Sequence, residues 1–109
     1  MKTKKEMKKR LIERALEVKA LQFGQFVLSS GKESNFYFDG RLLSLDPEGS
    51  FLISRLFLEQ IISSGVHFVG GPTLGADPIV SAITVLTHNT EHLVNGFLVR
   101  GSKKLYGTS

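Results

Sequence analysis

The sequence has 109 residues, of which 41% are hydrophobic and 22% charged, a composition typical of one globular domain. It contains no cysteine, which excludes disulfides and thiolate metal sites. The net charge is +4. No stretch is apolar for long enough to span a bilayer, and the basic start lacks the apolar core of a signal peptide. We therefore expect a cytoplasmic protein.

The positive charge is concentrated at the N-terminus. Residues 1–10 carry six basic side chains and one acidic side chain, so the rest of the sequence has a net charge of −1. A basic arm on a neutral body can contact nucleic acid. Chain ends are usually loose, and we favour a solvated, fraying helix start over a nucleic-acid contact.

The first 45 residues predict a helix followed by a hairpin. Apolar side chains recur at helical spacing from Met7 to about Leu21, which indicates an amphipathic helix. Two short segments rich in aromatic and β-branched residues, 25–28 and 35–39, flank the turn-forming residues 29–34. This order predicts a hairpin with a polar tip.

A second helix is predicted between Asp46 and Gly65. Asp46 followed by Pro47 is typical of a helix start, and Ser64-Gly65 is typical of a helix end. Helical spacing places five apolar residues on one face, which we expect to be buried. They are Phe51, Leu52, Leu56, Phe57 and Ile61.

The remaining sequence predicts a βαβ unit. Residues 66–69 indicate a short strand, Asp77-Pro78 begins a helix in the same way as Asp46-Pro47, and residues 97–99 indicate another strand. The intervening helix is apolar nearly all round and should be buried. The order predicts an α/β fold with a parallel sheet and flanking helices. With only two such strands the sheet is incomplete.

Residues 70–78, Gly-Gly-Pro-Thr-Leu-Gly-Ala-Asp-Pro, join a strand end to a helix start. Glycines allow a tight turn with exposed backbone N–H groups, and the helix dipole adds positive potential, so the segment can bind an anion. It matches neither the Walker A nor the dinucleotide-binding pattern. From spacing alone, phosphate binding and an unliganded connection are equally supported.

Two other segments carry candidate ligand-binding residues. Residues 100–109 contain three cations, two glycines and several hydroxyls after a strand, which fits either a mobile cationic loop or a frayed tail. Ser30-Gly31-Lys32 and the aromatic segment 36–38 could hold a charged, flat ring, although ordinary core packing of the rings is favoured.

The remaining polar residues indicate no metal site. Only His88 and His92 share a ligand-like spacing among the three histidines, and their neighbours are typical of a loop. Asp39, Asp46 and Asp77 lie near turns or helix starts and are explained as helix caps.

Four segments in order resemble landmarks of the orotate phosphoribosyltransferases, which are type I phosphoribosyltransferases. They are residues 23–32 (FGQFVLSSGK), 34–39 (SNFYFD), 45–49 (LDPEG) and 71–79 (GPTLGADPI). The resemblance covers about residues 10–109. It implies transfer of phosphoribose from phosphoribosyl pyrophosphate, carried with Mg²⁺, to orotate in pyrimidine biosynthesis, by a homodimer.

The resemblance also assigns roles to residues. Thr73, Leu74 and Gly75 would receive the pyrophosphate, and Lys32, Tyr37 and Phe38 would flank the base. Arg100 and Lys104 match the first arginine and the later lysine of the family's mobile loop, so they would be the catalytic cations and would contact phosphoribosyl pyrophosphate. Lys103 and Tyr106 would bind the same phosphoribosyl pyrophosphate.

Two departures from the family affect these expectations. Gly101 stands where the family has lysine and Tyr106 where it has histidine, although Lys103 can replace one lost cation. The family's later acid-acid-x-x-Thr-Thr-Gly-Gly segment, which holds the ribose 5-phosphate, is not found in the 109 residues.

We therefore expect one phosphoribosyltransferase domain cut off after its mobile loop and inactive alone. It comprises a basic arm (1–10), a helix and hairpin (11–45) and the start of the α/β core (46–109). A non-catalytic remnant that binds an anion, or that pairs with a full-length subunit, is the main alternative. A protein that binds nucleic acid through its basic arm is the weakest of the three hypotheses.

Overall fold

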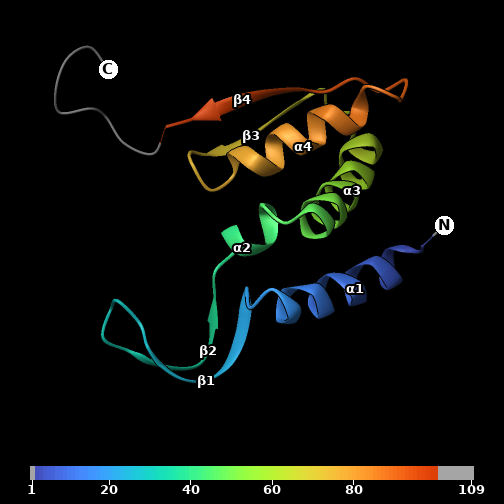
Figure 1. Cartoon of the computed structure of the whole chain (residues 1–109). Helices are drawn as coiled ribbons and strands as arrows, with labels where there is room; N and C mark the ends of the chain where they lie inside the picture. The colour runs from blue at the N-terminus through green and yellow to red at the C-terminus, as the bar shows by residue number, and fades with distance from the viewer. Residues whose placement is uncertain (1, 101–109) are drawn as a thin grey trace, which may run out of the picture.

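A computed structural model describes residues 2–100 of the chain (Figure 1). The elements in chain order are α1 (Lys4–Glu17), β1 (Leu21–Val27), β2 (Glu33–Phe38), α2 (Arg41–Ser44), α3 (Pro47–Ser64), β3 (Phe68–Pro72), α4 (Asp77–Thr87) and β4 (Asn95–Val99). In Figure 1, α1 and the β1–β2 hairpin form the lower part, and β3, α4 and β4 form the upper part. Helix α3 lies between them and contacts both α1 and α4.

Helix α1 starts with a capping box and ends earlier than its apolar pattern predicts. The Thr3 side chain accepts from the Glu6 N–H, and the Glu6 side chain accepts from the Thr3 N–H. The helix stops at Glu17 because Lys19 adopts a left-handed conformation (φ 63°), which turns the chain and buries Ala20 completely. The prediction of a helix to Leu21 is therefore wrong, since Leu21 begins β1.

The predicted hairpin is confirmed, with strands longer than the sequence indicated. β1 and β2 pair antiparallel, with Leu21 opposite Phe38 and Val27 opposite Glu33. The register shifts between Phe23 and Phe26, which indicates a bulge in β1. The backbone N–H of Asp39 donates to Ala20 O (2.7 Å), so the open end of the hairpin is fixed to the end of α1.

The predicted ends of α3 are confirmed. The Asp46 side chain caps the helix by accepting from the Gly49 N–H (2.9 Å), and Gly65 ends it in a left-handed conformation (φ 76°). The predicted buried face is partly wrong. Phe51 and Phe57 are half exposed, whereas Leu58, which was not expected in the core, is buried.

The reason is that α3 is covered on two sides. Leu52 and Ile61 are buried as expected, and the small side chain of Ser54 is also buried, because α1 and α2 pack on one side of α3 and α4 on the other. The short helix α2, which has no sequence signal of its own, occupies part of this contact. Its residue Leu43 packs in a core cluster with Ala15 and Ala20.

The predicted βαβ unit is confirmed as a parallel β3–β4 pair joined through α4, with Gly70 opposite Phe97. Ile83 of α4 is buried against Ile61 and Val94. The expectation that α4 is buried all round is wrong. Val85 is 68% exposed because, within residues 2–100, α4 packs mainly against the sheet and α3.

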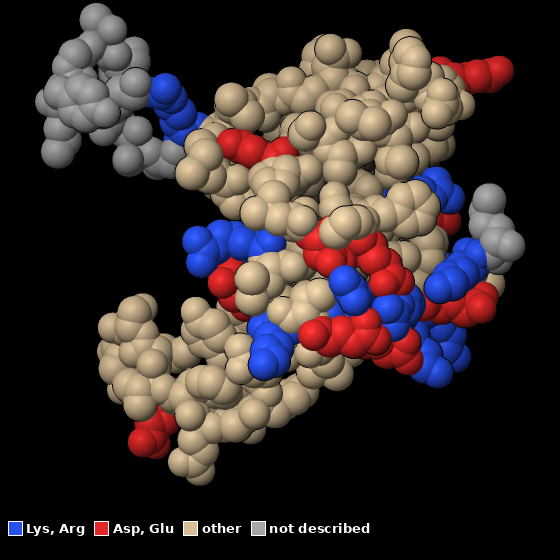
Figure 2. Space-filling view, viewed as in Figure 1, with Lys and Arg blue, Asp and Glu red and all other residues tan. Residues whose placement is uncertain are grey.

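Charged side chains interleave over α1 and the start of α3, whereas the visible surface of α4 and β4 carries little charge (Figure 2). Arg10 forms a bidentate pair with Glu48 (2.6 and 2.7 Å), and Arg14 forms one with Asp46 (2.9 and 2.7 Å). These pairs join α1 to the N-terminus of α3. Among the described helices, none combines the length and apolarity that crossing a membrane requires.

Candidate functional site

The glycine-rich segment forms a loop of four residues, 73–76, between β3 and α4. The Thr73 N–H donates to Val99 O of β4 (2.8 Å), and the Ala76 N–H donates to Pro72 O (3.0 Å). These bonds hold the loop against the carboxyl ends of both parallel strands. In α/β sheets ligands bind at this end of the strands.

Three backbone N–H groups remain available at the loop. Within residues 2–100, the amides of Leu74, Gly75 and Ile79 donate no hydrogen bond. Leu74 and Gly75 lie in the turn, and Ile79 lies in the first turn of α4, where helical N–H groups lack a partner. The loop and the positive end of the α4 dipole together provide donors for an anion without any basic side chain.

Gly71, near the end of β3, and Gly75, in the loop, have different surroundings. A Cβ atom on Gly71 would lie 2.6 Å from Ala76 Cβ, closer than carbon atoms can approach. A Cβ atom on Gly75 would meet nothing within 4 Å. Gly71 is therefore required for the loop to fold back on β3, whereas Gly75 leaves its side open to a ligand.

The role predicted for Asp77 as a helix cap is wrong. Ala76 is the N-cap residue of α4 and makes no side-chain cap bond, and Asp77 is the first residue of the helix. The Thr73 hydroxyl lies 3.5 Å from Asp77 Oδ1, a long hydrogen bond across the loop. Asp77 therefore places a carboxylate beside the available amides.

A cavity of about 320 Å³ lies between this loop and the exit of the hairpin. It is lined by Phe38, Gly40, Arg41, Leu43, Ser44, Ile53, Gly75 and Ile79. The wall thus combines residues of β2, α2, α3, the loop and α4. An aromatic residue, an arginine and the edge of the glycine-rich loop therefore line one space.

Arg41 is the basic side chain of this cavity, and the sequence analysis did not identify it. Its Nε donates to Asp39 Oδ1 (3.1 Å), and the Arg41 guanidinium lowers the pKa of the Asp39 carboxyl. The side chain is 77% exposed, so it can turn toward a ligand. The available signal was its position directly after the aromatic strand and Asp39, since functional residues often follow strand ends.

The structure separates the residues that were predicted to flank a base. Consecutive residues of a strand point to opposite faces, so Phe38 lines the cavity whereas Tyr37 faces the other way. The Tyr37 ring centroid lies 5.7 Å from that of Phe26 in β1. Lys32 lies in the hairpin turn and does not line the cavity.

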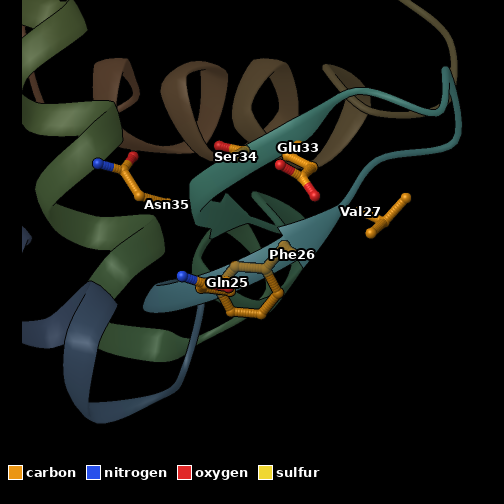
Figure 3. A pocket seen from close by; sticks show the side chains of 6 residues that line it. All are labelled: Gln25, Phe26, Val27, Glu33, Ser34 and Asn35. Carbon is orange, nitrogen blue, oxygen red and sulfur yellow. The ribbon is translucent and has the colours of Figure 1, made fainter.

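The hairpin carries its own cavity of about 450 Å³, shown in Figure 3. It is lined by Gln25, Phe26, Val27, Glu33, Ser34 and Asn35. In Figure 3 the Phe26 ring lies beside Gln25, and Val27 points away from the other five. The lining contains the carboxylate of Glu33 and no cation, so it is less suited to an anionic ligand than the cavity beside Arg41.

The predicted cationic loop begins at Arg100, which is exposed and directly follows β4. Because Val99 O accepts from the Thr73 N–H, the chain enters this loop beside the glycine-rich loop. Gly101, Lys103, Lys104 and Tyr106 lie outside the described residues.

The histidines pair differently from the predicted spacing. The rings of His67 and His92 stack with centroids 4.1 Å apart, whereas His88 lies at the end of α4. His67 Nδ1 lies 2.8 Å from Leu93 O, and His92 Nε2 lies 2.6 Å from Val66 O. These contacts fasten the starts of β3 and β4 together. Across residues 2–100 there is no cluster of three or more histidine, aspartate or glutamate side chains suited to a metal ion.

No protein-family model matches the chain, but individual relatives do. An orotate phosphoribosyltransferase of Pyrococcus furiosus is 40% identical over 104 residues, covering 94% of this chain and 54% of the relative. The orotate phosphoribosyltransferase of Rhodopirellula baltica is 41% identical over 98 residues, covering 84% of this chain and 51% of the relative. The chain thus spans about half the length of the curated relatives that it matches.

Solved structures give the same result. The Mycobacterium tuberculosis orotate phosphoribosyltransferase in complex with inorganic phosphate matches with a TM-score of 0.71 and 35% identity, over 87% of this chain and 54% of that chain. The same enzyme in complex with 5-phospho-α-D-ribosyl 1-diphosphate matches with a TM-score of 0.61 and 37% identity, over 83% of this chain and 52% of that chain. Over the half of their length that it spans, the chain is similar in sequence and in fold to the orotate phosphoribosyltransferases.

Proposed function

We propose that the chain provides the pyrophosphate and base side of an orotate phosphoribosyltransferase site. The reaction joins orotate to the phosphoribosyl group of phosphoribosyl pyrophosphate and releases pyrophosphate. The observation that carries the proposal is the cavity that Phe38 and Arg41 line together with Gly75 and Ile79, whose amides donate no hydrogen bond within residues 2–100. The relatives and solved neighbours named above support it.

The loop would stabilise the leaving group. As the bond between the ribosyl carbon and pyrophosphate breaks, negative charge grows on the pyrophosphate oxygens. The amides of Leu74, Gly75 and Ile79 and the α4 dipole are already oriented, so they can stabilise this negative charge without rearranging. A donor of this kind typically contributes about 2.7–4 kcal/mol to lowering a barrier. The hydroxyl of Thr73 is a further donor at the same loop.

The opposite wall of the cavity would hold the base. Orotate is a flat ring with a carboxylate, so it can stack on Phe38 while its carboxylate pairs with Arg41. Asp39 would keep Arg41 near this position when the cavity is empty. Contacts of Lys32 and Tyr37 with the base remain predictions, because neither side chain lines the cavity.

The cationic loop would complete the site from the side of β4. Arg100 and Lys104 are proposed as the catalytic cations, with Lys103 and Tyr106 as further contacts of the phosphoribosyl pyrophosphate. These cations would attract the departing pyrophosphate, whose negative charge is growing, more strongly than they attract the bound substrate. This difference is what lowers the barrier.

Magnesium would arrive with the substrate. Mg²⁺ commonly binds substrate phosphates and water with one or two carboxylates, and Asp77 is the carboxylate at the loop. Asp77 is a single carboxylate at this loop. It is therefore suited to contact a hydrated Mg²⁺ ion that is already bound to the substrate phosphates, and not to bind the ion with protein ligands alone. The ion would neutralise phosphate charge. We further propose a homodimer and a cytoplasmic location, in keeping with this chemistry.

A chimera tests the proposed function. The matching segment of the Pyrococcus furiosus relative is replaced by this chain, and orotate consumption is followed with phosphoribosyl pyrophosphate and Mg²⁺. We expect turnover by the chimera and none by the 109-residue chain alone, since the chain spans about half of its relatives. Within the chimera, Lys104→Ala should reduce kcat far more than it weakens orotate binding.

Two results would contradict the proposal. A folded chimera without turnover would favour a non-catalytic, anion-binding protein, provided that pyrophosphate still binds. Unchanged orotate affinity in Arg41→Gln, compared with Arg55→Gln as a control outside the cavity, would remove Arg41 from the base site.

A further inference from the structure

A third cavity lies between α1 and α3; it shares Phe38, Leu43 and Ile53 with the cavity beside the glycine-rich loop but contains no residue of that loop. Its volume is about 450 Å³. It is lined by Lys4, Lys8, Leu11, Phe38, Leu43, Ile53, Leu56, Phe57 and Gln60. We call this space the α1–α3 groove.

The groove follows from the spacing of residues on the two helices. Lys4, Lys8 and Leu11 are separated by four and three residues and therefore share one face of α1. Ile53, Leu56, Phe57 and Gln60 share one face of α3 in the same way. Leu11 and Ile53 also pack against a buried cluster, so the floor of the groove is continuous with the core.

The groove is apolar except for three of its lining residues, which are Lys4 and Lys8 of α1 and Gln60 of α3, and its lining contains no carboxylate. The arginines of the same helix differ, since Arg10 and Arg14 are paired with Glu48 and Asp46. Among the described residues, no carboxylate lies within 4.0 Å of either lysine ammonium group.

We propose that the α1–α3 groove binds an amphiphilic carboxylic acid. The alkyl chain lies against Leu11, Leu56 and Phe57, and the carboxylate lies between Lys4 and Lys8. Mostly apolar pockets of roughly 300–1,000 Å³ with a few convergent polar groups are typical small-molecule sites. An α-helix is about 10–12 Å across, so a space of this size suits an alkyl chain better than a docked helix.

The proposal explains the basic N-terminal segment in a way that the sequence did not suggest. Its lysines fall on different faces of α1. Lys4 and Lys8 border the groove, whereas Lys5 and Lys9, one position later, do not line it. Substituting Lys5 and Lys9 is therefore a matched control for substituting Lys4 and Lys8, because the residue type, the helix and the change in net charge are the same.

The test is calorimetric titration of the 109-residue chain with sodium decanoate below its micelle concentration. Lys4→Glu/Lys8→Glu should weaken binding about tenfold, since two favourable charge contacts become repulsive. Lys5→Glu/Lys9→Glu should change the dissociation constant less than twofold. Methyl NMR signals of Leu11 and Leu56, which line the groove but not the cavity beside the glycine-rich loop, should shift on binding in the unmodified chain. Circular dichroism checks that each variant is folded, and Lys4→Gln/Lys8→Gln replaces the charge reversal if folding is impaired.

Several results would overturn the proposal. Equal weakening by both charge reversals would show that general attraction, and not the groove, binds the acid. Decanol binding as tightly as decanoate would remove the role of the lysines. Preferential binding of an acidic amphipathic peptide over decanoate would identify the groove as a protein-docking site instead. None of these measurements requires phosphoribosyl transfer, so they are independent of the function proposed above.

Discussion

Replacing Gly71 by alanine should destabilise the chain because the added methyl group has no space. Its Cβ would lie 2.6 Å from Ala76 Cβ, about 0.8 Å inside the 3.4 Å at which ordinary contact begins. Ala76 Cβ is fixed to the backbone and cannot rotate away, so the loop itself must move. Overpacking of this kind costs about 1–3 kcal/mol.

The expected net effect is smaller, because alanine also restricts the unfolded chain, which returns about 0.4–1 kcal/mol. We therefore expect a loss of roughly 1–2 kcal/mol in the free energy of unfolding. In a domain of this size that lowers Tm by roughly 4–16 °C. Urea and thermal unfolding followed by circular dichroism measure both quantities.

A second substitution identifies the contact responsible. Gly71→Ala/Ala76→Gly removes the clash, and glycine is well tolerated at an N-cap position such as 76, so most of the lost stability should return. Gly75→Ala is the matched control, since its Cβ would meet nothing within 4 Å. Wild-type stability of Gly71→Ala, or a double variant no more stable than the single one, would refute the steric explanation.

Other predictions concern the core and the joint between α1 and α3. Leu58→Ala should cost about 2–5 kcal/mol, because Leu58 is 1% exposed, whereas Val85→Ala on the exposed side of α4 should change stability by less than about 0.5 kcal/mol. Urea unfolding compares the two, and equal losses would contradict the assigned core. Arg14 lowers the pKa of Asp46 to about 2 from an ordinary value of 3.8, so their pairing should stabilise the fold above about pH 4 and be lost as the pH falls toward 2. Asp46→Asn, which retains a cap, should therefore flatten stability measured from pH 6 to 2.5; an unchanged slope would assign the acid sensitivity elsewhere.

Features set by local chemistry could be predicted from the sequence. The start and end of α3 follow from a capping carboxylate, a proline and a glycine, each of which acts within one helical turn. The hairpin and the βαβ order follow from alternating and continuous apolar segments in the same way. These predictions needed no knowledge of distant contacts.

Features set by contacts between distant segments could not be predicted from the sequence. Lys19 turns the chain at the end of α1 although lysine rarely adopts a positive φ, and the buried Ala20 beyond it depends on packing against Leu43. Helix α2 is only four residues long and forms where that packing occurs. No local rule indicates such an element.

The candidate site shows the same division. The available amides of the glycine-rich loop were expected from its composition, but their position beside Phe38 and Arg41 depends on how α3 places the hairpin against the βαβ unit. The alternation of β2 would have indicated that Tyr37 and Phe38 face opposite sides. By this alternation Phe38 lines the cavity and Tyr37 does not, whereas contacts of either residue with a base remain predictions.

The central claim is that the glycine-rich loop binds the pyrophosphate group. The most direct test is titration of the isotopically labelled chain with Mg²⁺-pyrophosphate, followed by amide NMR. We predict that the largest shifts occur at Leu74, Gly75 and Ile79, with a smaller shift at Arg41. Largest shifts in the basic segment 2–10, or no shift in the loop at saturation, would contradict the account.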